Sequence, residues 1–180
     1  KDSAGVTVNT GLGTDTVNSL SVLGANMLSV TGGSLTVANS FAAAAATSLS
    51  AGTLTLNGTS TMASLAQSGG TLGGTGTVTV TGASSWLAGT QTGSGTTVYA
   101  SALAASGPGA KLIAGGRTIE LNGTTTWSGN GSLQFAGGTL NNRGTFSDQN
   151  AAAVLIDHVS GTNAFNNIGT YSKQGNSVTS

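Results

Sequence analysis

Residues 118–146 contain three short runs in which apolar and polar residues alternate, and then a fourth run that repeats the first. The runs are 119–121, 124–127 and 133–135, and small-residue turns rich in Gly and Asn separate them. Leu140 then stands where the first apolar residue of the stretch stood. Alternation of this kind is typical of β-strands, and Gly and Asn mark turns. The stretch therefore predicts one full coil of three strands, as in a parallel β-helix.

Three patterns recur along the chain and favour a stack of such coils. A nine-residue pattern of two alternating aliphatic residues, a Gly turn, two hydroxyl residues and a Met or Trp occurs at 54–62, 78–86 and 119–127. The pattern Leu-x3-Gly-Gly-x-Leu occurs at 28–35, 65–72 and 133–140. The sequence LNNRGTF at 140–146 is echoed by FNNIGTY at 165–171. Because each pattern returns in the same order, we expect equivalent strands to lie above one another.

Alignment of these copies predicts the first inward residue of each successive coil. The expected row is Val17, Leu35, Leu54, Val78, Val98, Ile119, Leu140 and Phe165. The spacing varies around ~21 residues, as expected when strands are constant in length and turns accept insertions. The prediction is thus an all-β parallel β-helix of about eight coils, spanning 1–180 as one unit of a longer repetitive chain. An antiparallel sandwich is the main competitor, but it does not explain the constant order of the repeats.

Composition excludes several classes of protein. Only 6% of the 180 residues are charged and the formal net charge is +0, so nothing favours binding to nucleic acid or an anionic membrane. There is no Cys, which excludes a disulfide scaffold and thiolate metal sites. No apolar run approaches the ~18 residues of a membrane-spanning helix, so we expect no membrane insertion of this segment. Thirty residues are Gly, but the regular alternation argues against disorder.

Two stretches fit the pattern poorly. Residues 41–46, FAAAAA, could form a short helix, a flat strand or a packed corner. Residues 151–159, AAAVLIDHV, form the longest apolar run near the end of the chain. We interpret this second stretch as a buried strand in preference to a short covering helix.

The acidic residues do not suggest a catalytic site. They are scattered along the chain as Asp2, Asp15, Glu120, Asp148 and Asp157. Enzymes that cleave polysaccharides need carboxylates or basic groups clustered on one face. The pair Asp157-His158 is the one acid–imidazole neighbour pair, and adjacent residues of a strand point to opposite faces. We therefore expect a structural role for His158 and no enzymatic activity.

A calcium site is one weaker candidate. Residues 11–18, GLGTDTVN, match most of the nonapeptide that binds Ca²⁺ in β-rolls, with Asp15 as the acidic ligand. Because Ca²⁺ prefers 6–8 oxygen ligands from adjacent loops, a single copy is insufficient by itself. The alternative is a Gly-rich turn before the strand at Val17, and the primary prediction is that the chain needs no cofactor.

A glycan site is the other candidate. Trp86 and Trp127 could each stack on a sugar if their rings were exposed. The two residues end equivalent copies of the nine-residue pattern, in the position that Met62 occupies in the remaining copy. This shared position favours burial or packing at a corner.

The repeats resemble those of a known group of proteins. The GTLxVxG-type strands, the G-x-[ST]-[ST]-W turn and the paired [LF]-N-N-x-G-T-[FY] elements look like filamentous-haemagglutinin-like adhesins and autotransporter passengers. This resemblance, from roughly Val17 onward, implies a right-handed β-helix exported to the bacterial cell surface or beyond. It transfers no binding residue, because such families share a scaffold and differ in what they bind.

The function expected from this resemblance is a structural or adhesive repeat segment that acts as an elongated stalk or spacer. Its partners would be neighbouring repeats of its own chain, and copies could associate end to end or side by side because the ends of a β-helix expose unpaired strand edges. The alternatives are a flank that binds a glycan or host surface and, less favoured, a polysaccharide-acting enzyme.

Overall fold

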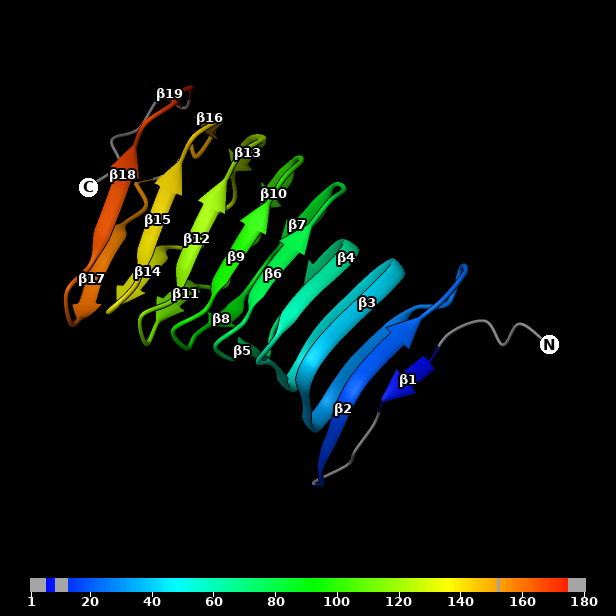
Figure 1. The fold of residues 1–180 in the computed structure, drawn as a ribbon. Coiled ribbons are helices and arrows are strands. Elements are labelled where there is room, and N and C mark those ends of the chain that lie inside the picture. The colour runs from blue at the N-terminus through cyan, green and yellow to red at the C-terminus, as the bar shows by residue number, and fades with distance from the viewer. Residues whose placement is uncertain (1–5, 9–12, 152, 175–180) are drawn as a thin grey trace.

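The computed structural model describes residues 6–8, 13–151 and 153–174. These residues form 19 strands of one sheet and no helix, and the strand pairings are parallel. The strands wind as a solenoid of about eight coils, which Figure 1 shows stacked from the N-terminal to the C-terminal end. The prediction of an all-β parallel β-helix is therefore confirmed.

The coils from residue 71 onward have three strands each, because most strands pair with the third strand before and after them in the sequence. The resulting three faces of the solenoid are named here by their strands. The first face holds β6 (Thr77–Val80), β9 (Thr96–Tyr99), β12 (Thr118–Leu121), β15 (Thr139–Asn142) and β18 (Ala164–Asn167). The second face holds β7 (Ser84–Trp86), β10 (Leu103–Ala105), β13 (Thr124–Trp127), β16 (Thr145–Asp148) and β19 (Thr170–Lys173). The third face holds β5 (Thr71–Gly73), β8 (Gly89–Gln91), β11 (Lys111–Ala114), β14 (Leu133–Ala136) and β17 (Ile156–Ser160).

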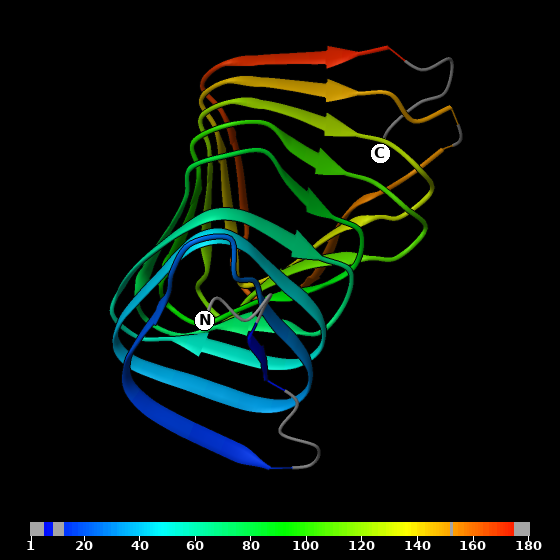
Figure 2. The same ribbon diagram turned by 90° about the vertical axis from the view of Figure 1, so that its right-hand side faces the viewer.

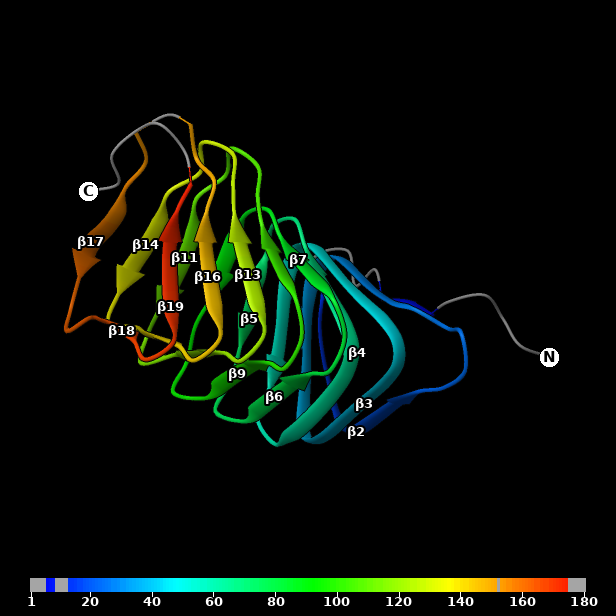
Figure 3. The same ribbon diagram turned by 90° about the horizontal axis from the view of Figure 1, so that it is seen from above.

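The N-terminal coils are built from longer strands that bend around the corners (Figure 3). They comprise β1 (Val6–Val8), β2 (Thr14–Val22), β3 (Leu28–Leu56) and β4 (Thr59–Gln67). The stretch 41–46 lies within β3, so the extended alternative is the one that the chain adopts. Alternate residues of this stretch, such as Phe41 and Ala43, are buried, which gives the alanine run the period of a strand.

The solenoid is right-handed, as the resemblance implied. Figure 2 looks along its axis with the N-terminal coils nearest the viewer, and the chain runs clockwise as it recedes. This is the hand that crossover connections between parallel strands almost always adopt.

Inward side chains form rows that run along the axis and fill the core. The first inward row of the first face is Leu20, Phe41, Ser60, Val78, Thr97, Ile119, Leu140 and Phe165. The predicted placement of Val78, Ile119, Leu140 and Phe165 is confirmed. Val98 was wrongly placed, because Thr97 points inward and Val98 outward. The buried side chain of Arg117 donates to the Thr97 hydroxyl, which gives this polar residue a partner in the core.

The first three residues of the predicted row lie on another face. Leu54 pairs with Leu72 on the third face, whereas Val78 pairs with Ser60. Val17 and Leu35 are also on the third face. They do not pair with each other, because Val17 pairs with Val37, two residues further along the strand. The physical reason is that the strand–Gly–strand pattern can form any corner of a coil, so it does not identify which corner.

The same offset separates Met62 from the tryptophans. Met62 lies beside Val80 on the first face. Trp86 and Trp127 share a row on the second face, with Ala105 between them. The copy at 54–62 is thus turned by one face relative to the copies at 78–86 and 119–127.

The prediction of a buried strand over 151–159 was partly wrong. A strand is present, but β17 starts at Ile156 and ends at Ser160, and residue 152 lies outside the described residues. Val154 is buried, whereas Leu155 and Val159 are about half exposed. Their exposure follows from their place in the last described coil, whose outer edge is not paired within the described residues.

Candidate functional site

The two tryptophans are core residues. The side chains of Trp86 and Trp127 are 1% exposed, and the Trp127 indole Nε1 donates to the backbone oxygen of Gly131 at 3.1 Å. A sugar stacks on an exposed ring face, which neither residue offers. The folded chain therefore does not provide the glycan platform that the sequence suggested for them.

Asp15 is exposed and lies within β2, where it pairs with Leu35. Gly11 and Leu12, the start of the proposed calcium-binding loop, lie outside the described residues. In the part of the chain that the structure describes, no group of three or more His, Asp or Glu side chains is close enough to share a metal ion. The calcium site at Asp15 remains a prediction.

The described acids remain apart in space, as their spacing predicted. Glu120 lies on the first face, where its carboxylate accepts from Arg143 Nε at 2.7 Å and from Asn141 Nδ2 at 2.6 Å. Asp148 lies in the core of the second face. Asp157 lies in β17 on the third face. Glu120, Asp148 and Asp157 thus lie on three different faces of the solenoid.

A cluster of polar side chains lies inside the middle coils. Gln91 Nε2 donates to Gln67 Oε1 at 3.1 Å and to the Tyr99 hydroxyl at 2.7 Å. Arg117 donates from Nη2 to Thr97 Oγ1 at 2.6 Å and from Nη1 to the Gly74 oxygen at 3.3 Å. All five side chains are buried, so this cluster connects neighbouring coils and is closed to solutes.

Burial shifts the ionisation of this cluster. It raises the pKa of Tyr99 to about 12, because a buried phenolate would lose its hydration. It lowers the pKa of Arg117 to about 10 for the corresponding reason, with partial compensation from nearby Tyr99. Both groups keep their usual charge at neutral pH, so the cluster supplies neither a general base nor a nucleophile.

Lys111 is a second buried cation. Its side chain is 0% exposed, and Nζ donates to the backbone oxygen of Gly109 at 3.0 Å. Burial lowers the pKa of Lys111 to about 8. An amine with a lowered pKa can act as a nucleophile, but this one is enclosed by the coil and no substrate reaches it.

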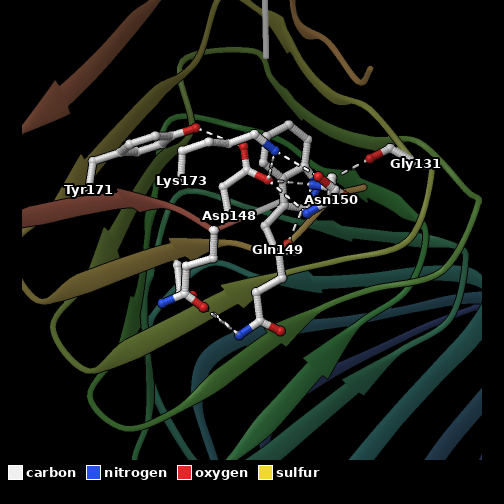
Figure 4. A network of polar contacts seen from close by, with 9 residues as sticks. Gly131, Asp148, Gln149, Asn150, Tyr171 and Lys173 are labelled. Carbon is white, nitrogen blue, oxygen red and sulfur yellow. Dashed lines mark hydrogen bonds and ion pairs between the residues drawn. The ribbon is translucent and has the colours of Figure 1, made fainter. Parts of the chain in front are cut away.

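A network around the buried Asp148 carboxylate is the densest polar arrangement near the C-terminal end (Figure 4). Tyr171 donates its hydroxyl to Oδ2 at 2.9 Å, and Lys173 Nζ lies 3.2 Å from Oδ1. The backbone N and the side-chain Nδ2 of Asn150 both donate to Oδ1, at 3.0 and 2.9 Å. Lys173 also donates to the Asn150 oxygen at 2.8 Å. The network fixes the last two coils to each other.

The sequence holds a signal for this network, although the prediction used only the residues that match between the two closing repeats. The two closing repeats extend beyond their aromatic residues, to Asp148 in one and Lys173 in the other. These residues are direct neighbours in the parallel ladder, as are Phe146 and Tyr171. Comparison of the residues that differ between the two repeats would have placed an acid beside a cation.

A hollow of about 140 Å³ lies on the inner side of β17 and β18; we call it the terminal hollow. It is lined by Phe135, Ile156, Asp157, His158, Asn163, Ala164 and Phe165. Asn163 Oδ1 accepts from the backbone N of Gly137 and Gly138 at 2.6 and 3.0 Å. Its Nδ2 lies 2.6 Å from His158 Nδ1. Asp157 and His158 therefore both line this hollow, which strict alternation along a strand did not predict; a register shift in the pairing of β14 with β17 accompanies it.

Comparison with protein-family models, with curated proteins and with solved structures found no match. Among the described residues, no helix is long and apolar enough to cross a bilayer. What the chain does is therefore inferred from the geometry of the solenoid and its ends.

Proposed function

We propose that this chain is a structural spacer of an extracellular bacterial surface protein or fibre. The observation that supports the proposal is the continuous stack of about eight parallel coils. At about 4.8 Å per coil, such a stack makes a rod roughly 35–40 Å long. A rod of this kind holds the elements at its two ends at a fixed separation.

The flanks of the rod support a structural role. Outward side chains bond to their equivalents in the next coil: Asn166 Nδ2 donates to Asn141 Oδ1 at 2.8 Å, and Gln149 Nε2 donates to Gln174 Oε1 at 3.4 Å. The described acids are separated, and two of them are occupied by Arg143 and Lys173. Polar groups on these flanks thus join coils to each other, and we infer no reaction with an external substrate.

The extracellular location is proposed from the resemblance of the repeats to those of bacterial adhesins and passenger domains. The absence of Cys is compatible with it. Binding of a glycan along one flank is less favoured, because the two aromatic residues that motivated it are buried.

The spacer proposal can be tested by placing the chain between two small fluorescent domains and measuring the distribution of their separation by single-molecule energy transfer. We expect one narrow distribution, longer than that of a direct fusion by about 35–40 Å. A Gly/Ser linker of equal residue number is the matched control and should give a broad distribution. A broad distribution for the solenoid itself would contradict the proposal.

The glycan alternative is tested by applying the same fusion to a glycan array. We expect no bound spot for the fusion with the solenoid beyond those of the fusion with the linker. Specific binding that depends on the solenoid would restore the adhesive flank as the leading function.

A further inference from the structure

An amine, a carboxylate and a carboxamide meet where the chain leaves β16 (Figure 4). Lys173 Nζ donates to Asp148 Oδ1 at 3.2 Å and to the backbone oxygen of Asn150 at 2.8 Å. The side-chain Nδ2 of Asn150 donates to the same Asp148 oxygen at 2.9 Å. One carboxylate oxygen therefore contacts both the amine of Lys173 and the amide nitrogen of Asn150.

The register of three successive coils holds these groups together. Asp148 and Lys173 are direct neighbours in the parallel ladder of β16 and β19. The backbone N of Asn150 donates to Asp148 Oδ1 at 3.0 Å, so the turn after β16 folds back onto the carboxylate. Asn150 Nδ2 also donates to the backbone oxygen of Trp127 in the preceding coil at 3.4 Å. The groups are thus oriented by the backbone before any reaction between them.

The carboxylate and the carboxamide are closed to water, whereas the amine reaches the surface. Asp148 is 0% and Asn150 is 1% exposed, and the ring of Tyr171 stacks beside them on Phe146 with centroids 5.5 Å apart. The side chain of Lys173 is 25% exposed. A site that excludes water favours reaction between its own groups over hydrolysis. The exposed side of Lys173 gives a small product a way out.

We propose that Lys173 and Asn150 form an intramolecular amide bond, with Asp148 as the catalytic base. Lys173 Nζ gives a proton to Asp148 Oδ1 and attacks Cγ of Asn150, moving to it from the backbone oxygen of the same residue. The carboxyl oxygen passes the proton to Nδ2, the Cγ–Nδ2 bond breaks and ammonia leaves. One ammonium and one primary amide thus give one secondary amide and one ammonium ion, so no co-reactant is needed. The ion pair described above is the reactant state.

The product is a covalent link between two successive coils. Asn150 and Lys173 are 23 positions apart in the sequence, so the link closes a loop that contains β17 and β18. Such a link restricts the unfolded chain, as a disulfide does, and prevents the two coils from separating. The step modifies the chain itself and acts on no external substrate. It does not depend on the spacer function, because the coils are joined whether or not the rod separates other domains.

The test is the intact mass of the folded chain, measured by electrospray mass spectrometry after purification and again after prolonged incubation at neutral pH. We expect a mass that is lower than that of the sequence by one ammonia. Trypsin should no longer cleave after Lys173, because the amine it recognises has become an amide. The tryptic peptide that begins at Gly144 should carry the whole deficit and continue past Lys173.

Three variants each remove one participant in the reaction. Lys173→Arg, Asn150→Ala and Asp148→Asn should all keep the full mass of their sequences. Lys173→Arg retains a cation beside the carboxylate, so it separates loss of the nucleophile from loss of the ion pair. Gln149→Ala, at the exposed residue between Asp148 and Asn150, is the matched control and should still lose one ammonia. Circular dichroism checks that every variant keeps its strands.

Peptide mapping distinguishes the proposed bond from other losses of ammonia. An Asn-Gly sequence, such as that at 122–123, also loses ammonia when it cyclises to a succinimide, but this leaves the trypsin site at Lys173 open. Full mass throughout the incubation, or a loss of ammonia that persists in Lys173→Arg, would overturn the proposal. Loss of one water in place of ammonia would make Asp148 the electrophile and would overturn the role assigned to Asn150.

Discussion

The buried ammonium of Lys111 predicts that stability depends on pH in an unusual direction. Burial lowers the pKa of Lys111 from 10.5 to about 8 in the folded chain. Between these values the unfolded chain binds a proton that the folded chain does not, so the free energy of unfolding rises with pH. Below about pH 8 the burial penalty is present in full, and above 10.5 it has disappeared. We expect urea denaturation midpoints to increase from about pH 8 to about pH 9, where Tyr99 and Arg117 still keep their protons.

The variant Lys111→Met provides the control for this prediction. Its neighbours in the ladder are Gly89 and Leu133, so an unbranched apolar side chain suits the row. We expect the variant to lose the rise with pH and to be more stable at pH 7 by about 1 kcal/mol or more, because a buried charge is removed. If the denaturation midpoint rises equally with pH in both proteins, a group other than Lys111 causes the rise.

Asp148 is the residue whose removal should be most costly among the described acids. Truncation by Asp148→Ala leaves donors of Asn150, Tyr171 and Lys173 without their acceptor in the last coils. We expect a loss of about 3 kcal/mol in unfolding free energy, measured by urea denaturation, since breaking a buried ion pair on one side costs that much. Arg143→Ala breaks an exposed ion pair with Glu120 and should cost less than about 1 kcal/mol. If the two variants lose equal unfolding free energy, burial is not what makes the Asp148 ion pair important.

At the scale of the strand and turn, the sequence predicted where strands and turns form better than it predicted which face of the coil each strand occupies. Alternation at 119–121 and the paired repeats at 140–146 and 165–171 predicted the strands and their mutual register correctly. The pattern at 54–62 was assigned to the wrong corner, because three similar corners accept the same strand–Gly–strand sequence. Thr97 was missed because its burial depends on Arg117, 20 residues away.

The turns between strands depend on Gly where two coils approach closely. A Cβ on Gly144 would lie 2.1 Å from the Gly123 oxygen in the coil before it, and backbone atoms cannot yield without separating the coils. Gly144→Ala should therefore cost about 3 kcal/mol. Gly24 has φ of 65° but nothing within 4 Å of a Cβ, so Gly24→Ala should cost only about 1 kcal/mol from backbone strain. Thermal unfolding followed by circular dichroism distinguishes the two variants. Similar decreases in their melting temperatures would show that contact between coils is unimportant.

At the scale of the whole molecule, the inward row that runs from Asp15 to His158 could not be predicted from the sequence. Asp15 and His158 are far apart in the chain, and they share a row only because eight residues from successive strands are in register. That register depends on every insertion between them, including the shift beside Phe135. Local patterns in the sequence predicted the strands, whereas the course of this row through the stack required the three-dimensional structure.

A stack of equivalent coils should also tolerate the removal of one complete coil. Ile119 and Leu140 occupy the same place in successive coils, so deleting residues 119–139 joins Thr118 directly to an equivalent strand. Stability in repeat proteins is a sum over repeats and their interfaces, so we expect the shortened chain to fold with a lower unfolding free energy. Small-angle scattering should show a rod shorter by about 4.8 Å. Deleting only 119–128 puts all later inward residues out of their rows, and this chain should not fold. If the half-coil deletion folds as well as the full-coil deletion, the rows of inward side chains are not what specifies the solenoid.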